Sequence, residues 1–279
     1  MNQPLTEEQV ASLRPDIYSS LIPLLRTTPN SKIETYLFES SSNTAISNTK
    51  VNSHCYFLQL SGNLMPRVKD FAKYLGNRIT DFTIPRSEIT RALNQGVIEN
   101  STTPVDELNS KARSLFTESL TSGEGGELLL SLLAEHYLKL PQLFTKMVLK
   151  TNSKVHVHGS DGMHVGVNSI NNNLTLYWGE SKLHADSAQA ARECFASLAP
   201  FLLDDGGSDS SQVRDLQLMR EGLDLNSKNL EEALKKYLDP NHVNFNKLEY
   251  RGLCLIGFDS NTYPSAPNSK EMHELAAEI

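Results

Sequence analysis

The stretch VHVHGSDGMHVGVNSINNNLTLYWGESKL, residues 155–183, constrains the fold most, because it reads as two strands joined by a tight turn. The runs on either side of Asn171–Asn173 are apolar, and asparagine tolerates the positive φ that such turns need. The sequence therefore predicts a β-hairpin. The stretch nevertheless contains three histidines, an aspartate, a glutamate and a lysine. Either this is a surface sheet with polar decoration, or the ionisable groups converge on a metal and a reaction.

Two residues of the second strand point the same way. Side chains alternate along a strand, so Glu180 and Lys182 share one face at its end. Asp161 stands 19 positions before Glu180, where the first strand begins. Pairing through the turn would bring Asp161 close to both. A surface ion pair also produces Glu-x-Lys, but two converging carboxylates repel unless a divalent cation joins them, and Mg²⁺ accepts such carboxylates together with phosphate oxygens.

A further acid is available on the strongly apolar helix predicted from Glu124 to Lys139. Polar residues recur on one stripe of this helix at spacings of three and four, opposite a leucine-rich side; they are Glu124, Glu127, Ser131 and Glu135. A solvated face is the simplest interpretation. The glycines at the helix start weaken it, because glycine costs helix stability and permits close backbone approach.

This order of residues resembles a known nuclease core. An acid on a helix, an Asp opening a strand, Glu-x-Lys ending the next strand and then a helix is the order of the PD-(D/E)xK nucleases. The sequences of three segments give a more specific resemblance. They resemble the nuclease subunits of the Hachiman antiphage system, the HamA family, and read GEGGELLLSLL, KVHVHGSDGMHV and LYWGESKLH. The resemblance is clearest over residues 120–200 and extends to residues 54–90.

The resemblance implies a fold, a site and an activity. The fold would be a restriction-endonuclease-like mixed sheet flanked by helices, of the α/β (α+β) class. Asp161, Glu180 and Glu127 would hold Mg²⁺ or Mn²⁺, and Lys182 would act on the attacking water. Glu124 is the second choice for the helical acid, because Gly125-Gly126 stands where a bulkier residue is expected. The activity would be that of a Mg²⁺-dependent endo- or exodeoxyribonuclease, the effector of a complex with a superfamily 2 helicase subunit.

The remaining pattern predicts two regions. Residues 1–98 are expected to form an N-terminal α+β accessory region that binds a partner. Residues 99–279 are expected to form the nuclease domain with a C-terminal extension. Helices are predicted over 4–27, from Pro66 to 79, after Pro85, and over 100–120, 185–203 and 213–238. Further strands are predicted over 31–40, 54–62 and 250–258, and a loop is predicted over 39–53.

Charge and composition bear on the partners. The net charge is −7 at pH 7, whereas a free-standing nucleic-acid binder usually carries a basic excess. If this chain cleaves DNA, a local basic patch or a partner must bring the DNA to it. The chain has no run of ~20 apolar residues and no secretory pattern at its start, so we expect a cytoplasmic protein. Its three cysteines are far apart and indicate buried thiols rather than a disulfide framework.

Two other functions remain open at this point. His156 and His158 form an H-x-H pair with His164 nearby, which would suit a Zn or Fe enzyme. Alternatively, the acidic surface would make the chain a non-catalytic docking subunit. Ser-nucleophile and ATP-hydrolysing chemistry have no support, because neither a G-x-S-x-G elbow nor a P-loop is present.

Overall fold

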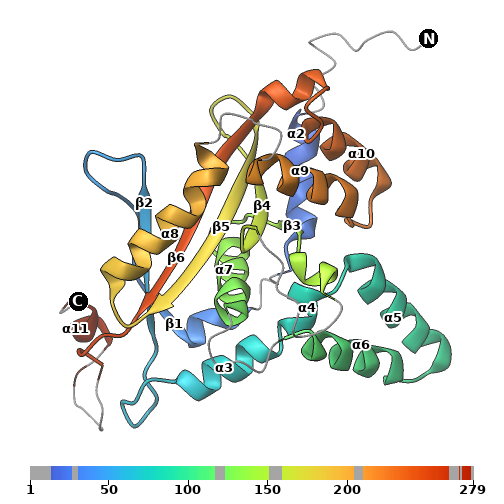
Figure 1. Cartoon of the computed structure of the whole chain (residues 1–279). Helices are drawn as coiled ribbons and strands as arrows, with labels where there is room; N and C mark the ends of the chain where they lie inside the picture. Colours follow the sequence, from blue (N-terminus) through green and yellow to red (C-terminus); the bar gives the residue numbers. More distant parts are fainter. Residues whose placement is uncertain are drawn as a thin grey trace, which may run out of the picture. The chain divides into compact units, whose positions relative to one another are not determined.

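The computed structural model describes residues 14–26, 31–116, 123–150, 159–203, 210–263, 270 and 272–277 (Figure 1). Within these residues the chain has a mixed α/β fold with two β-sheets, which confirms the predicted class. The chain divides into two compact units. Unit 1 comprises residues 1–27 and 78–257, and unit 2 comprises residues 28–77 and 258–279.

Unit 1 is built on a four-stranded sheet with the order β3-β4-β5-β6. The strands are β3 (Gln142–Phe144), β4 (Gly162–Val167), β5 (Leu174–His184) and β6 (Leu248–Phe258). Antiparallel pairing joins β3 to β4 and β4 to β5. In Figure 1, β5 and β6 point the same way, so the sheet is mixed.

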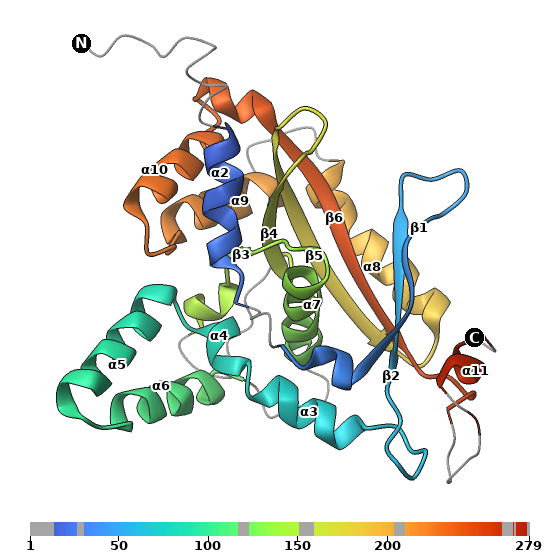
Figure 2. The same cartoon turned by 180° about the vertical axis from the view of Figure 1, so that it is seen from behind.

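Two helices cover opposite faces of this sheet, as Figures 1 and 2 show for α7 (Glu124–His136) and α8 (Ser187–Leu202). The Trp178 ring stacks on Phe201 of α8 at a centroid distance of 5.8 Å. Gly179, the next residue of β5, faces Leu130 of α7. The chain order α7-β3-β4-β5-α8-β6 therefore places one helix on each side of the sheet, with α8 on the route between two parallel neighbours. This agrees with the expected restriction-endonuclease-like arrangement.

The main core lies between these layers. Because both faces of β4 and β5 are covered, their sequences read as nearly continuous apolar runs. The fully buried side chains at its centre are Met163, Val165, Leu176, Trp178, Leu216, Met219 and Leu234.

Unit 1 has nine other helical elements among the described residues. They are α2 (Arg14–Leu21), η1 (Ile22–Leu24), α4 (Ile79–Thr83), α5 (Arg86–Glu99), α6 (Thr103–Ser114), η3 (Lys146–Leu149), α9 (Ser211–Gly222), α10 (Lys228–Tyr237) and η4 (Val243–Lys247). Of these, α2, η1, α9, α10 and η4 contribute side chains to this core or pack against it. Among the described helices, none is long and apolar enough to cross a membrane.

The single helix predicted over residues 213–238 is wrong. Helix α9 ends at Gly222, Asn226 takes a positive φ of 56°, and α10 begins afresh at Lys228. The Ser227 hydroxyl caps α10 by accepting a hydrogen bond from the Leu230 amide. Asparagine tolerates the left-handed backbone and serine is a favoured N-cap, so the LNS sequence breaks the helix.

Unit 2 is a small α+β assembly. It contains η2 (Ile33–Thr35), β1 (Leu37–Ala45), β2 (Asn52–Leu58), α3 (Val68–Gly76) and α11 (Met272–Ala277). The antiparallel β1–β2 pair extends into residues 39–53, which the sequence analysis predicted to be a loop. The paired strands are largely exposed there, and most of their side chains in this part are polar. The Tyr263 hydroxyl donates to the Leu58 carbonyl at 3.0 Å, so the last segment of the chain belongs to this unit.

These units do not divide at residue 98. Helices α4 and α5 group with unit 1, where the Asp224 carboxylate accepts hydrogen bonds from the backbone and hydroxyl of Ser87, both at 2.9 Å. The functional division into a partner-binding region (1–98) and a nuclease domain (99–279) stays a prediction.

Candidate active site

The predicted hairpin is present. Strands β4 and β5 pair in register from Val167↔Leu174 to Gly162↔Gly179. One position further, the Asp161 amide donates to the Gly179 carbonyl at 2.8 Å. Continuing this register places Asp161 opposite Glu180 at the open end of the hairpin.

The turn at the other end is tied to β6. Asn172 takes a positive φ of 57°, which asparagine tolerates. The side-chain amides of Asn168, Asn171 and Asn173 all donate to the Glu249 carboxylate, at 2.8, 2.5 and 3.1 Å. These bonds lower the pKa of Glu249, so it stays an anion that holds the turn.

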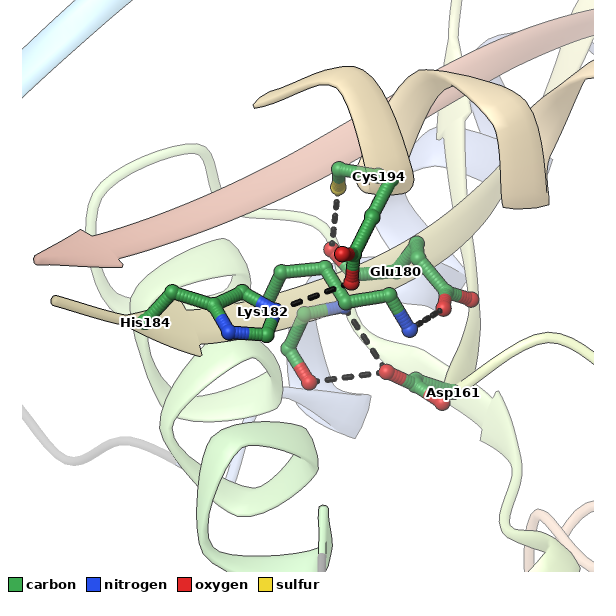
Figure 3. A network of polar contacts seen from close by, with 7 residues as sticks. Asp161, Glu180, Lys182, His184 and Cys194 are labelled. Carbon is green, nitrogen blue, oxygen red and sulfur yellow. Dashed lines mark hydrogen bonds and ion pairs between the residues drawn. The ribbon is translucent and has the colours of Figure 1, made fainter. Parts of the chain in front are cut away.

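Asp161 is oriented by Ser181. Its Oδ2 accepts hydrogen bonds from the Ser181 backbone N–H and from the Ser181 hydroxyl, both at 2.7 Å (Figure 3). Burial raises the pKa of Asp161, while the Ser181 bonds and the charge of Lys182 oppose this; the net direction is upward. The carboxylate is thus partly withdrawn from water and fixed in direction.

Glu180 and Lys182 form a direct pair on the same side of β5. The Lys182 Nζ donates to Glu180 Oε1 at 2.5 Å, and Glu180 is only 5% exposed (Figure 3). Burial raises the pKa of Glu180, and the nearby charge of Asp161 raises it further. Burial lowers the pKa of Lys182, but the hydrogen bond and charge of Glu180 outweigh it, so the net shift is upward. Lys182 is therefore a fully charged ammonium beside two acids.

Helix α8 supports Glu180 from one face of the sheet. The Cys194 thiol donates to the Glu180 carbonyl at 3.2 Å, as Figure 3 shows. The Ser197 side chain hydrogen-bonds the Glu180 carboxylate. Both the backbone and the side chain of Glu180 are therefore held by the helix that follows its strand.

Helix α7 supplies Glu127 from the other face. Its carboxylate makes no hydrogen bond or salt bridge with any residue of the described ranges. Burial, followed by the charges of Asp161 and Glu124, raises the pKa of Glu127 to about 8, although Lys146 and Lys150 act in the opposite direction. The second candidate, Glu124, is instead engaged in a buried ion pair with Lys150. Of the two candidates Glu124 and Glu127, Glu127 is thus the one without a salt bridge among the described residues.

Asp161 is the common neighbour of the other two acids. Its charge acts on Glu127 from the α7 side and on Glu180 from the α8 side. Within the described ranges, no three His, Cys, Asp or Glu side chains already form a compact metal-binding group. The donor chemistry still fits Mg²⁺ or Mn²⁺, which prefer carboxylate oxygens. Burial is the main cause of the raised pKa values of these acids, and a divalent cation would offset the added repulsion from neighbouring acids at Glu127 and Glu180.

Several residues near the site were missed by sequence reasoning. Ser181 stands inside the Glu-Ser-Lys motif, but only the strand register shows that it binds Asp161. Lys146 and Lys150 come from the apolar segment LFTKMVLK, where their i, i+4 spacing was the available signal. Gly126 is required for close packing, since a Cβ there would lie 2.8 Å from the Ser181 hydroxyl. This accounts for one of the glycines at the start of α7.

The histidines contribute less to the site. His156 and His158 lie outside the described residues. His164 is fully buried, and its Nδ1–H donates to the Leu140 carbonyl at 2.9 Å. Burial lowers the pKa of His164 to about 4. It is a neutral core residue at neutral pH.

Comparison with known proteins gives the family. No curated protein sequence matches the chain significantly. The family model for HamA matches residues 33–279, which is most of the chain and includes Glu127, Asp161, Glu180 and Lys182. The chain therefore belongs to the HamA family and is a component of the Hachiman antiphage defence system.

Proposed function

We propose that this protein is a metal-dependent DNA nuclease, the effector subunit of a helicase–nuclease defence complex. The observation that carries the proposal is the open end of the β4–β5 hairpin. There Asp161 stands opposite Glu180, and Lys182 is bonded to Glu180. Two acids and a lysine at adjoining strand ends are the residue types that phosphodiester hydrolysis requires.

The metal would be held by Asp161, Glu180 and Glu127. A divalent cation at such a site lowers the pKa of a bound water and polarises the phosphodiester. Glu127 fits this role because its half-buried carboxylate makes no salt bridge with the described residues, and it stands in the first turn of a helix that packs on β5. Glu124 fits it less well because Lys150 already compensates its charge.

Lys182 has a separate role. In hydrolysis, the oxygen of water attacks the phosphorus and gives up a proton to solvent. The bond from phosphorus to the leaving deoxyribose oxygen breaks, that oxygen takes up a proton from solvent, and negative charge grows on the phosphoryl oxygens in the transition state. The Lys182 ammonium, oriented by Glu180, would position the water and stabilise that charge. Burial of the neighbouring carboxylates strengthens such electrostatic effects.

The charge of the chain agrees with a partner that delivers the DNA. A net charge of −7 disfavours tight binding to a polyanion by this subunit alone. A superfamily 2 helicase subunit of the same system would bring the strand to the site, and residues 1–98 would form the region that binds it. The proposal predicts weak DNA binding by the isolated chain and a stable complex with the helicase.

The test is a cleavage assay on supercoiled and linear DNA, with Mg²⁺ or with a chelator, by the chain alone and with its helicase. Lys182→Ala and Glu180→Gln are expected to lower cleavage roughly 100-fold or more while the melting temperature is retained. Lys235→Ala is a matched control, because Lys235 pairs with Glu232 on α10, outside the site.

Full cleavage by both site variants would contradict the assignment. If no preparation cleaves DNA, with or without the helicase, the docking subunit becomes the better account. Tight, salt-sensitive DNA binding by the chain alone would contradict the delivery role of the partner.

A further inference from the structure

A second buried ion pair lies next to the site. Lys146 of η3 and Asp215 of α9 are 69 positions apart, and their Nζ and Oδ2 atoms are separated by 2.9 Å. The side chains are 10% and 0% exposed. Lys146 is also close enough for its charge to act on Asp161 and Glu127.

The same Asp215 oxygen holds the turn that leads into Asp161. Oδ2 accepts hydrogen bonds from the Ser160 backbone N–H at 3.2 Å and from the Ser160 hydroxyl at 3.4 Å. The preceding residue, Gly159, takes a φ of +122°. A Cβ at that position would overlap Lys146 Nζ and lie 2.7 Å from Asp215 Oδ1. The backbone of the turn therefore packs directly on the ion pair, and only glycine fits there.

This arrangement is poorly suited to a purely stabilising role. Among the described residues, Asp215 Oδ1 has no hydrogen-bond partner, and Arg214 Nε lies 3.6 Å from it. Buried ion pairs of this kind are often replaceable by apolar residues without loss of stability, because desolvation offsets their attraction. Burying this ion pair costs desolvation free energy, and the pair holds Ser160, the residue before Asp161. These two observations indicate a role in positioning Asp161.

We propose that Asp215, paired with Lys146, is a positioning residue for the nuclease site. Asp215 anchors the Gly159–Ser160 turn, so that the Asp161 carboxylate meets Ser181 and lies opposite Glu180. Lys146 holds the Asp215 carboxylate in this position through the 2.9 Å ion pair. This role rests on the proposed nuclease activity, but its structural part can be measured without activity.

Two double variants separate anchoring from simple stability. Lys146→Met with Asp215→Leu removes both charges and the acceptor for Ser160. Lys146→Met with Asp215→Asn also removes both charges but keeps an oxygen that can accept from the Ser160 N–H. Both leave the interior without an unpaired charge, which is the usual cause of collapse when one partner is removed.

The expected results differ between the two. In the complex with the helicase, the Met/Leu variant should lose roughly 10- to 100-fold in kcat with KM for DNA unchanged, because orientation rather than DNA binding is impaired. The Met/Asn variant should retain kcat within roughly 5-fold. Hydrogen exchange at the Ser181 amide, which donates to Asp161, should accelerate in Met/Leu and not in Met/Asn. Exchange in α10 serves as the internal control.

Normal kcat together with normal Ser181 exchange in a folded Met/Leu variant would overturn the proposal. If that variant does not fold, Gly159→Ala provides the test. Its Cβ would overlap Lys146 Nζ and lie 2.7 Å from Asp215 Oδ1, so the turn must move off the ion pair. A lower kcat and faster Ser181 exchange are expected, and unchanged values of both would count against the anchor. If the wild-type complex cleaves no DNA, the proposed function fails, while faster Ser181 exchange in Met/Leu would still support the anchor.

Discussion

Ser181 donates two hydrogen bonds of 2.7 Å to one oxygen of Asp161, from its backbone N–H and from its hydroxyl. Ser181 directly follows Glu180 on β5, so the strand that carries one acid also orients the other. The spacing between these acids is therefore set by backbone pairing rather than by freely rotating side chains. This arrangement makes the residue between Glu180 and Lys182 a positioning residue of the proposed site.

Ser181→Ala should lower both DNA cleavage and stability. It removes one of the two bonds to the Asp161 carboxylate and leaves the backbone bond in place. Hydrogen bonds to charged groups contribute about 1.5–3 kcal/mol, so we expect DNA cleavage to fall roughly 10-fold and stability by no more than about that energy. Steady-state cleavage and urea unfolding measure the two effects. Ser114→Ala on α6 is the control, and an equal loss of cleavage there would refute the specific role of Ser181.

Neighbouring glycines at the start of α7 should respond in opposite ways to alanine. A Cβ at Gly125 meets nothing within 4 Å, whereas one at Gly126 would lie 2.8 Å from the Ser181 hydroxyl and 3.2 Å from its Cβ. Gly125→Ala should stabilise the protein by up to about 1 kcal/mol through helix propensity. Gly126→Ala should destabilise it by about 1–3 kcal/mol, because α7 and β5 must separate. Equal midpoints of urea unfolding for the two variants would contradict this packing.

Glu127→Gln should make the metal-free protein more stable at pH 8. The folded pKa of Glu127 is about 8, against an ordinary value of 4.5. Between these pH values the folded state retains a proton that the unfolded state releases, so stability falls as pH rises through the window. Glutamine removes this penalty and should gain at least about 1 kcal/mol at pH 8, while cleavage is lost. Urea unfolding in the presence of a chelator measures the gain.

The matched variant Glu124→Gln should instead lower the stability of the protein. It leaves Lys150 buried without its partner. Breaking a buried pair from one side costs about 3–5 kcal/mol. If Glu124→Gln is the variant that gains stability and Glu127→Gln the one that unfolds, the assignment of the two acids is reversed.

His164 should make the protein acid-sensitive. Its folded pKa is about 4, against an ordinary value of 6.5. Between these values the unfolded state takes up a proton that the folded state excludes, so stability falls as pH decreases, by about 3 kcal/mol over the whole window. His164→Gln keeps a donor for the Leu140 carbonyl and should flatten the stability curve between about pH 4.5 and 6.5. An unchanged slope would show that other groups control acid unfolding.

The sequence contained enough to predict the hairpin, because its two apolar runs flank an asparagine turn and the pattern of alternation is strong. Glu180 and Lys182 could be placed on one face by that alternation alone, and they are bonded there. The helices α7 and α8 followed from their apolar spacing. These are local properties, which nearest neighbours along the chain largely determine.

The missed features are those that depend on contacts between distant segments. Nothing near Lys146 in the sequence indicates Asp215, because the two residues are 69 positions apart and meet only in the folded chain. The choice between Glu124 and Glu127 likewise depends on Lys150, which lies beyond the end of the helix. The break between α9 and α10 was missed because the apolar periodicity continues across Asn226, where a single left-handed residue interrupts the helix.

The bonds between Glu249 and the turn asparagines have a consequence for the opposite end of the hairpin. Glu180 lies six positions after Leu174 on β5, which is about 20 Å of extended chain. A slip of one residue in the β4–β5 register would turn Glu180 and Lys182 toward α7 and Ser181 toward α8. Because Glu249 binds three asparagines of the turn at once, it fixes the register in which β4 and β5 pair. Substitutions in this turn, although far from the proposed site, would therefore change which side chains the open end of the hairpin presents there.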